Sequence, residues 1–452
     1  MLNLYEETEF LDRIAIDELG LNSEILMENA AFAIAKRVRK ELKKGSKVLL
    51  FCGSGNNGAD GVAALRMLSK EYKTYCYLCF DKLSPMLQKQ LLIAQKAGVV
   101  VTKEKIEAKC YLDGIFGSGL NRDIGQNIVE IIDWINDKKG LRIAIDLPSG
   151  LGRNTTIKAD FTIAMGGIKL LCLSDFAKDF VGKIEVANLG VDKSLYQKES
   201  DYKLVRKKDL ELVKREQNTN KSDFGRVNVV MGRMSGAAIL SALAAQTMGA
   251  GLVSIVSKER VSVPPTIMTK ENIEDDAVIV VGPGFVDEFK EFDKLTKKSV
   301  VIDAGLCYNS ATIEFLKNNT NTVITPHPKE FVSLLSLSRL AHIDVATLQK
   351  ERFKFAKMWS LEFGGVLVLK GANTIVAKEG KLFVVSCGTP KLAKGGSGDV
   401  LTGVIAALIA QKQNLLKASI NGVLAHALSA KKSKVNDYAF DSMELIKGLK
   451  WL

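Results

Sequence analysis

Histidine, aromatic side chains and long apolar runs are scarce in this chain of 452 residues. With three histidines, a zinc site built on histidine is not expected. Aromatic residues make up 7% of the chain, and they form no stripe with basic residues of the kind that binds single-stranded nucleic acid. No apolar run reaches the ~18 residues of a membrane span, and the N-terminus lacks a signal-peptide pattern. The sequence therefore predicts a cytoplasmic protein without nucleic-acid or membrane partners.

The cysteines do not form a pattern that indicates disulfides or a metal. There are seven of them, an odd number, scattered through apolar stretches. Cys76 and Cys79 form a C-x-x-C, but they lie in an apolar run that is typical of a buried strand. A redox or zinc role needs a loop and further ligands, so neither role is expected here.

Blocks of five or six like charges are also missing, although the net charge is +12. A dispersed basic balance suits a small anionic ligand such as a nucleotide at least as well as nucleic acid. Apolar residues make up 47% and charged residues 25%, as in an ordinary globular protein. The length predicts two or three domains.

A strand followed by a glycine-rich loop stands near the start of the chain. Lys47–Cys52 has a buried-strand pattern, Gly53–Gly61 is the loop, and a helix is expected from Val62. This unit is typical of dinucleotide binding, although the loop is not G-x-G-x-x-G. Two asparagines and one aspartate in the loop offer side-chain oxygens to a ligand or a cation.

Two more strands end in acidic residues with glycine-rich loops. One strand ends at Asp113 and the other at Asp146. The carboxyl ends of parallel strands share one crevice, where ligands bind in open α/β sheets. Three such strand ends favour a ligand site over coincidence.

These motifs resemble those of the NAD(P)H-hydrate epimerase (YjeF N-terminal) family over roughly residues 1–200. They are Asn56–Gly61, Asp113 with the loop 117–119, and Asp146–Gly150. The family usually has glycine where this chain has Ala59, which is tolerable if φ is negative there. The resemblance implies a Rossmann-like three-layer α/β/α domain, here residues 1–205, that epimerises NAD(P)H hydrate.

The resemblance also implies roles for single residues. A potassium ion would be held by oxygens of Asn57, Asp113 and Ser149. The hydrated dinucleotide would be bound by Asn56, Asn57, Gly58, Ala59, Asp60, Gly117, Ser118, Gly119, Leu120, Asn121, Arg122, Asp123 and Asp146.

The implied chemistry fits these residue types. NAD(P)H hydrate carries a hydroxyl at C6 of the reduced nicotinamide ring, and the ring nitrogen can expel it to leave an iminium. Water can return on either face, which inverts C6. A carboxyl that gives and takes a proton suffices, and Asp146 is the candidate. Lys169 could face the anionic ligand, but a solvated lysine is the favoured interpretation.

A polar, charged segment from about residue 200 to 223 separates the two halves, and we place the domain boundary near residue 205. From Arg226 onward, strands again alternate with helices, which predicts a second α/β domain with a parallel sheet. Its most informative stretch is Gly388–Gly403. Gly395–Gly398 there lead to Asp399 and an apolar run, a loop that feeds a helix start and can form an anion hole. A glycine-rich turn capped by the aspartate explains this stretch equally well in isolation.

Six motifs of the second half resemble, in order, those of the ribokinase-like superfamily, and more closely its NAD(P)H-hydrate dehydratase branch. They are Lys221–Arg226, Ser235–Ala238, Gly282–Gly284, Thr325–Glu330, Lys370–Thr374 and Gly395–Asp399. The resemblance implies that residues 206–452 are a ribokinase-like α/β domain with dehydratase activity. The hydrate site would be lined by Ala238, Gly284, His327 and Asp399, and the nucleotide would be contacted by Lys370, Gly371, Ala372, Asn373, Thr374 and Gly398.

The resemblance predicts how this second site works. Asp399 would remove the proton of the C6 hydroxyl, which would take a phosphoryl group and then leave as phosphate. The nucleotide is expected to be ADP, with Mg²⁺, as in the bacterial-type branch of the family. Glu330 could position a metal-bound water or serve as a helix N-terminal charge. A homo-oligomer is expected.

Two other interpretations stay open at this point. The chain could be a ribokinase-like kinase for a small molecule such as a vitamin precursor, with a regulatory dinucleotide-binding N-terminal domain. Alternatively, the N-terminal half could be a non-catalytic dinucleotide- or protein-binding module.

Overall fold

The chain divides between Ser200 and Asp201 into two compact units in the computed structural model, which describes residues 1–120, 122–286 and 289–452. Residues 3–200 form the N-terminal unit, and residues 201–452 with Met1 and Leu2 form the C-terminal unit. The sequence places the boundary near residue 205. The two positions differ by one short strand, β10 (Tyr202–Val205), which pairs with β19 (Lys381–Val385) of the C-terminal unit.

The N-terminal unit is built on seven parallel strands in the order β4-β3-β2-β5-β6-β7-β9. Their bounds are β2 (Lys47–Cys52), β3 (Lys73–Leu78), β4 (Val100–Thr102), β5 (Cys110–Gly114), β6 (Leu141–Ile145), β7 (Phe161–Met165) and β9 (Lys183–Ala187). Beside it, β1 (Leu2–Tyr5) pairs in parallel with β8 (Ile168–Lys169).

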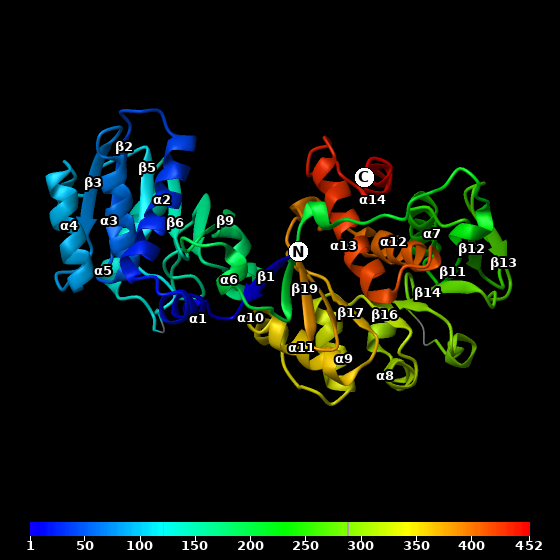
Figure 1. Cartoon of the computed structure of the whole chain (residues 1–452). Helices are drawn as coiled ribbons and strands as arrows, with labels where there is room; N and C mark the ends of the chain where they lie inside the picture. Colours follow the sequence, from blue (N-terminus) through cyan, green and yellow to red (C-terminus); the bar gives the residue numbers. More distant parts are fainter. Residues whose placement is uncertain (121, 287–288) are drawn as a thin grey trace. The chain divides into compact units, whose positions relative to one another are not determined.

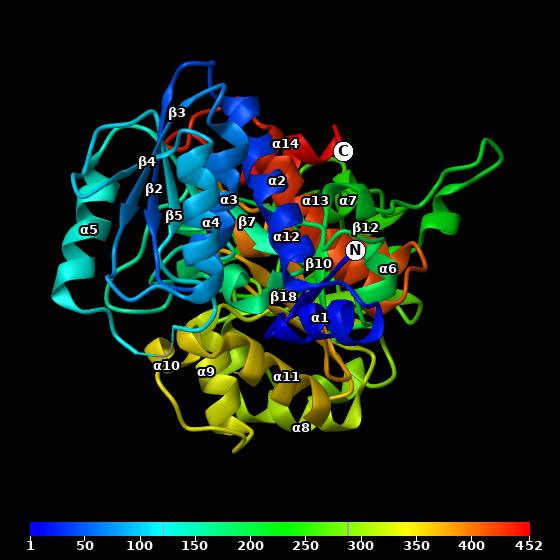
Figure 2. The same ribbon diagram turned by 60° about the vertical axis from the view of Figure 1, so that its left-hand side comes forward.

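Helices cover both faces of this sheet. On one face lie α2 (Ser23–Glu41), α3 (Asn56–Leu68) and α4 (Pro85–Lys96), and on the other lies α5 (Gln126–Asp137) (Figure 2). Alternate residues of β2 serve the two cores: Val48 and Leu50 pack with the first group, and Leu49 and Phe51 pack with α5. This is the predicted three-layer α/β/α arrangement. A short helix α1 (Glu9–Arg13), a π-helical turn (Ile14–Glu18) and α6 (Lys193–Tyr196) complete the unit.

The C-terminal unit has a mixed sheet in the order β13-β12-β11-β14-β15-β16-β17-β18-β19-β10. Only β18 runs antiparallel to its two neighbours in this series of described strands. The remaining bounds are β11 (Arg226–Val230), β12 (Leu252–Val256), β13 (Met268–Lys270), β14 (Ala277–Val281), β15 (Val300–Ile302), β16 (Thr322–Ile324), β17 (Val366–Leu369) and β18 (Thr374–Lys378). The predicted hairpin around Glu379 and Gly380 is confirmed by the pairing of β18 with β19.

Two groups of helices sandwich this sheet as well (Figure 1). One core contains residues of α7 (Ser235–Thr247), α12 (Ser397–Ala410), α13 (Leu415–Lys432) and α14 (Ser442–Leu449). The other contains residues of α8 (Ser310–Asn318), α9 (Pro328–Leu337), α10 (Val345–Lys350) and α11 (Arg352–Glu362). Helix α12 is apolar all round because it lies inside this layered structure, and every residue from Val400 to Ala410 is buried.

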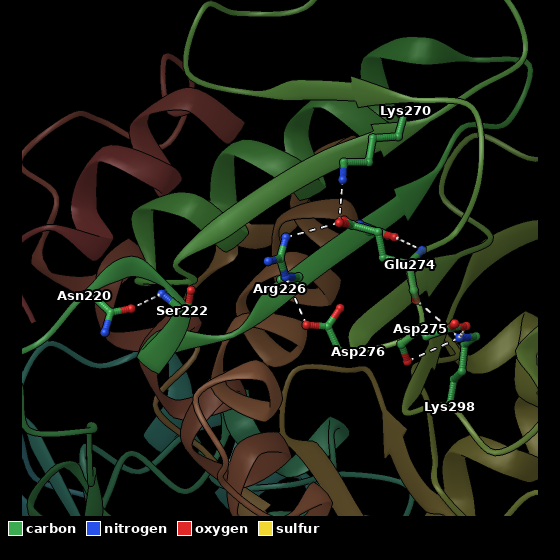
Figure 3. A network of polar contacts seen from close by, with 9 residues as sticks. Asn220, Ser222, Arg226, Lys270, Glu274, Asp275, Asp276 and Lys298 are labelled. Carbon is green, nitrogen blue, oxygen red and sulfur yellow. Dashed lines mark hydrogen bonds and ion pairs between the residues drawn. The ribbon is translucent and has the colours of Figure 1, made fainter.

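A network of charged side chains ties the start of β11 to the loop before β14 (Figure 3). Glu274 accepts hydrogen bonds from Arg226 (3.1 Å), Asn228 (3.0 Å) and Lys270. Asn228 is fully buried, and its own side-chain oxygen accepts from the Glu274 N–H at 2.8 Å. Glu274 thus satisfies a polar group inside the sheet, whereas its neighbour Asp275 is fully exposed.

Among the described residues, no helix combines the length and the apolar character that crossing a bilayer requires.

Candidate active sites

The N-terminal unit contains a cavity of about 970 Å³ at the carboxyl ends of its central strands. The strand ends and loops that the sequence singles out converge there, as expected for a parallel sheet. The predicted residues that line it are Asn56, Asn57, Asp60, Gly117, Ser118, Gly119, Leu120, Arg122, Asp123 and Asp146. Asn121 is also a predicted binding residue, but it lies outside the described residues.

Helix α3 begins at Asn56, six positions before the predicted start at Val62. Gly55 is the N-cap in an extended conformation, so the segment from Asn56 to Asp60 is helical and not a loop. The first N–H groups of this helix have no partner within it and lie at the cavity, where they suit a phosphate. The sequence pattern did not indicate this helix start, because asparagine and glycine are both unfavourable in a helix interior.

Two predicted binding residues in this helix lie behind the cavity wall. Gly58 is buried, and a Cβ there would lie 2.5 Å from the carbonyl oxygen of Gly53. Ala59 is 1% exposed and faces a second cavity of about 610 Å³ next to the first. Its φ is not positive, so the methyl group in place of the usual glycine is accommodated without strain.

Asp146 follows β6 in an unusual backbone conformation, with φ at 66°. This conformation costs free energy in a non-glycine residue, and residues in strained conformations of this kind occur often at functional sites. The Asp146 carboxylate accepts a hydrogen bond from the Lys169 ammonium at 2.5 Å. Lys169 is 3% exposed, so the expectation of a solvated lysine is wrong. β8 holds it inside the cavity, where its charge balances that of Asp146.

Asp113 lies at the end of β5 and is held by the loop of Ser149. It accepts hydrogen bonds from the Ser149 backbone N–H (2.7 Å) and hydroxyl (2.5 Å). Burial raises the pKa of Asp113 to about 6, although these hydrogen bonds lower it in part. A buried carboxyl of this kind is one that a bound cation would keep ionised.

The residues around Asp113 fit a cation bound by oxygen. Ser149 also accepts the Phe116 N–H at 2.9 Å, and a Cβ on Gly117 would lie 3.6 Å from the Asn57 side-chain oxygen. Asn57 and Ser149 therefore both contact the segment that follows Asp113. The side-chain nitrogen of Asn57 is buried and has no hydrogen-bond partner among the described residues. The Asn57 amide nitrogen thus does not hold the side chain in another interaction, and the amide oxygen is a suitable ligand for a cation.

Sequence reasoning missed Asp12, which comes from α1 and lines both cavities of this unit. Burial raises the pKa of Asp12 to about 6, and the nearby Asp146 carboxylate raises it further, against the effect of Lys169. Nothing in the local sequence distinguishes Asp12 from the other acidic residues of the N-terminal helices.

The second site forms around the start of α12. Gly396 is the N-cap in a left-handed conformation (φ 83°), and Asp399 lies in the first turn. The buried His426 of α13 contacts the Ser397 carbonyl oxygen at 2.9 Å and fixes this start from behind. Burial lowers the pKa of His426 to about 4, so it is neutral.

Lys370, at the end of β17, lies beside this helix start. Its ammonium forms an ion pair with Asp303 at 2.7 Å and lies 3.7 Å from Glu330. A Cβ on Gly398 would lie 3.3 Å from the Lys370 nitrogen, so the helix start and the ammonium lie close together. Burial raises the pKa of Asp399 to about 6, and Asp303 raises it further while Lys370 lowers it. The anion hole, the lysine and the candidate base therefore lie together.

Asp303 is a residue of this site that the sequence did not indicate, and Glu330 is one for which the sequence left two roles open. Asp303 is 2% exposed at the end of β15, and the acidic strand end was its only signal. Glu330 is 5% exposed and accepts the His327 N–H at 2.7 Å in a capping box at the start of α9. Burial raises the pKa of Glu330 to about 7. The expected helix N-terminal role of Glu330 is thus present, together with a place beside Lys370.

His327 is half exposed and is the N-cap of α9, and its Nδ1 accepts the Glu330 N–H at 3.2 Å. Gly284, another predicted site residue, has φ at 75°, and a Cβ there would lie 2.3 Å from the Met234 carbonyl oxygen. Ala238 is fully buried in the core, and its place in the hydrate site stays a prediction. Its neighbour Ala237 is the alanine of α7 that lies next to Gly284.

The predicted nucleotide-binding residues follow Lys370 in the loop to β18. Gly371 and Ala372 are exposed and Thr374 is partly exposed, whereas Asn373 is 3% exposed. The backbone of this loop is therefore open to a ligand beside the lysine, while Asn373 points into the protein.

Both halves of the chain match known protein families. The family model described as "YjeF-related protein N-terminus" matches residues 23–171, and the one described as "NAD(P)H-hydrate dehydratase" matches residues 227–450. A protein of Helicobacter pylori named bifunctional NAD(P)H-hydrate repair enzyme Nnr is 38% identical over 472 aligned positions that cover 100% of both chains. The protein of the same name from Escherichia coli is 30% identical and covers 93% of this chain and 87% of its own.

Among solved structures, an ADP/ATP-dependent NAD(P)H-hydrate dehydratase from Bacillus subtilis, co-crystallized with ATP and Mg²⁺, matches with a TM-score of 0.47. It is 26% identical and covers 55% of this chain and 96% of its own.

Proposed function

Since the chain belongs to the family of bifunctional NAD(P)H-hydrate repair enzymes, we propose that it repairs hydrated NADH and NADPH in two steps. The N-terminal domain (residues 1–205) interconverts the R and S epimers, and the C-terminal domain (residues 206–452) dehydrates the S epimer. The observation that carries the proposal is the pair of sites. A carboxylate paired with a buried lysine lies in the N-terminal cavity, and a carboxyl lies beside an anion hole in the C-terminal unit.

In the epimerase site, Asp146 exchanges protons at the C6 hydroxyl. The proton goes to the hydroxyl oxygen, the C6–O bond breaks, and the ring nitrogen supplies the electron pair that leaves an iminium and a water molecule. Return of water to the other face, with loss of one proton, inverts C6. The start of α3 and the loop 117–123 bind the dinucleotide, and Lys169 keeps the carboxylate in place.

A potassium ion in this site would be held by Asn57, Asp113 and Ser149. The buried carboxyl of Asp113 and the unpartnered amide of Asn57 support this assignment. The ion would supply positive charge next to the anionic dinucleotide.

In the dehydratase site, Asp399 takes the proton of the C6 hydroxyl, and the hydroxyl oxygen then accepts the terminal phosphoryl group of the nucleotide. Lys370, Gly398 and the N–H groups at the start of α12 stabilise the charge on the transferring group. The ring nitrogen then expels phosphate, and loss of a proton from the neighbouring carbon restores NAD(P)H. Ala238, Gly284 and His327 line the hydrate site, and Ala237 lies next to Gly284.

The nucleotide is ADP in this proposal, and the products are AMP and phosphate. It is contacted by Lys370, Gly371, Ala372, Asn373 and Thr374. Among the described residues there is no group of three or more histidine, cysteine, aspartate or glutamate side chains that could hold a metal ion. Mg²⁺ would be held chiefly by the nucleotide phosphates, and it would supply charge neutralisation there.

The test is to incubate the protein with mixed hydrate epimers and either ADP or ATP, and to follow both free phosphate and the absorbance of reduced nicotinamide. Clearance of both epimers with ADP is expected. Activity with ATP alone would overturn the choice of nucleotide. A stable phosphorylated product would instead support the alternative of a vitamin-precursor kinase, which the named relatives do not favour.

Asp146→Ala tests the first half alone. We expect dinucleotide binding to persist while epimerisation stops. Binding without epimerisation in the unmodified chain would instead indicate a non-catalytic module. A homo-oligomer and a cytoplasmic location stay predictions.

A further inference from the structure

The N-terminal cavity contains a second carboxyl that the mechanism above does not use. Asp12 comes from α1, whereas Asp146 follows β6, so two unrelated elements carry the two groups. Asp146 lines only the larger of the two described cavities next to it, but Asp12 lines both the 970 Å³ and the 610 Å³ cavity. Asp12 thus lies at the wall that the two cavities share.

Asp12 differs from Asp146 in its partners. Lys169 donates to Asp146 at 2.5 Å, whereas the Asp12 carboxyl forms no hydrogen bond or ion pair with any of the described residues. Asp12 is partly buried, and the charged groups that influence it are Asp146, Lys169 and Glu9. Asp60 of α3 also lines both cavities; burial raises its pKa well above the usual range, and the Asp146 and Asp12 charges raise it further.

The two carboxyls have contrasting environments. Burial, with the Asp146 charge in second place, raises the pKa of Asp12 to about 6, which keeps a fraction of Asp12 protonated near neutral pH. Asp146 has a cation at hydrogen-bonding distance to balance a negative charge. Pairs of carboxyls in contrasting environments are a common way to obtain an acid and a base in one site.

The epimerisation itself needs proton transfer on two faces. The group that protonates a departing hydroxyl also deprotonates water that returns on the same face, by microscopic reversibility. One carboxyl on one side of the flat iminium ring therefore assists exchange of the hydroxyl with water on its own face, and a second group on the other side would accelerate the return of water that inverts C6.

We propose that Asp12 is a second catalytic residue of the epimerase site, and that it exchanges protons with the C6 oxygen on the face of the nicotinamide ring opposite Asp146. This rests on the proposed epimerase function. On the Asp12 face, the carboxyl gives its proton to the C6 hydroxyl as the C6–O bond breaks and the ring nitrogen forms the iminium. Water that adds on that face returns a proton to the Asp12 carboxylate, so no oxidant or reductant is needed.

The experiment compares the full-length chain with Asp12→Asn and with the control Asp17→Asn. Asp17 is exposed on the adjoining π-helical turn and lines neither described cavity. Each purified epimer is incubated in ¹⁸O-labelled water without nucleotide, and both inversion and ¹⁸O incorporation are followed by chromatography and mass spectrometry. The non-enzymatic rates are subtracted.

Asp12→Asn is expected to slow inversion about 100-fold or more, the usual size of an acid–base contribution. It should still exchange ¹⁸O into one epimer with retention, since the Asp146 face is intact. Asp17→Asn should match the unmodified chain in both measurements. Equal loss of exchange and inversion for both epimers would overturn the assignment of opposite faces, as would an unchanged inversion rate.

Two further measurements distinguish a catalytic role of Asp12 from misfolding of the variant. Dehydration of the S epimer with ADP and binding of NADPH by Asp12→Asn show whether each domain is folded. If the unmodified chain fails to invert either epimer, the proposed epimerase function itself is wrong. If it inverts them and Asp12→Asn does so equally well, only the role of Asp12 is wrong.

Discussion

At the scale of single residues, the most telling group is Asp399, because a general base must be ionised to act. Burial raises its pKa to about 6, and Asp303 raises it while Lys370 lowers it. The proton must leave Asp399 before it can accept another from the substrate, so activity is lost as pH falls through the pKa. We expect the turnover number of dehydration to be level above about pH 7 and to fall roughly tenfold per unit below about pH 6.

The measurement is AMP formation from ADP and the S epimer at saturating substrate, corrected for acid decay of the hydrate. Glu330, whose pKa is about 7, is the other group near Lys370 that titrates in this range. Glu330→Gln is therefore the control. If the acid limb disappears in Glu330→Gln, then Glu330 and not Asp399 controls it.

The catalytic candidates could be predicted from the sequence, but their partners could not. Asp146 and Asp399 each stand in a motif of glycine and acidic residues at the end of a strand or the start of a helix. Their charge partners come from elsewhere: Lys169 is 23 positions from Asp146 along the chain, and Asp303 is 67 positions from Lys370. Only the sheet topology brings these residues together, so local patterns gave no signal for the pairing.

At the scale of secondary-structure elements, the start of α12 depends on one backbone conformation. Gly396 has φ at 83°, and a Cβ there would lie 2.4 Å from the Ser442 hydroxyl and 2.7 Å from Leu240. Gly396→Ala combines the cost of a left-handed conformation, about 1–2 kcal/mol, with this steric conflict. We expect a lower unfolding temperature of the C-terminal domain and a large loss of dehydratase turnover.

The neighbouring Gly395 is the matched control, because a Cβ there would meet nothing within 4 Å and its φ is not positive. Gly395→Ala should change the free energy of unfolding by less than ~0.5 kcal/mol. The two variants are compared by calorimetry and by the rate of the epimerase reaction, which neither should alter. Equal stability of both variants would show that the left-handed N-cap is not required.

A second element-scale prediction concerns the network in Figure 3. Glu274→Ala leaves the fully buried amide of Asn228 without its acceptor and removes one of the two acidic partners of Arg226 and the partner of Lys270. The loss of a partner for a buried polar group costs ~1–3 kcal/mol. We expect the C-terminal domain to lose about this much free energy of unfolding in urea, with no change in the KM for ADP.

Asp275→Ala is the control at the adjacent position. Asp275 is fully exposed, and its ion pair with Lys298 at 3.0 Å should contribute ~0–1 kcal/mol. If both variants lost the same free energy of unfolding, the loss of a negative charge at this surface would explain the effect, and the buried hydrogen bond to Asn228 would not.

The elements themselves were predicted well where apolar runs were long and poorly where they were short. The central strands and α12 follow from continuous apolar residues. The start of α3 did not, because asparagine and glycine, which make up four of the six residues from Asn56 to Gly61, have low helix propensity; Gly58 packs closely against Gly53 there. The strand β1, with four residues near the N-terminus, gave no distinct pattern at all.

At the scale of the whole molecule, each domain carries its own acid–base group, and the product of one reaction is the substrate of the other. Hydration of NAD(P)H yields both epimers, and a dehydratase that accepts only S would strand R. In Asp146→Ala we therefore expect fast clearance of the S epimer with ADP, followed by a slow phase set by non-enzymatic epimerisation. In Asp399→Asn both epimers should persist and interconvert.

The two variants should complement each other when they are mixed. A mixture of full-length Asp146→Ala and Asp399→Asn contains one intact site of each kind, although on different chains. If the epimers pass through solution, the mixture clears R nearly as fast as the unmodified protein at equal site concentration. Clearance by the mixture that stays at the slow phase of Asp146→Ala would mean that the epimers do not pass between chains. The rate at which the mixture clears R is then measured at several total protein concentrations. If the epimers diffuse freely between chains, this rate rises with protein concentration. If transfer is confined to one chain, the mixture clears R slowly at every concentration.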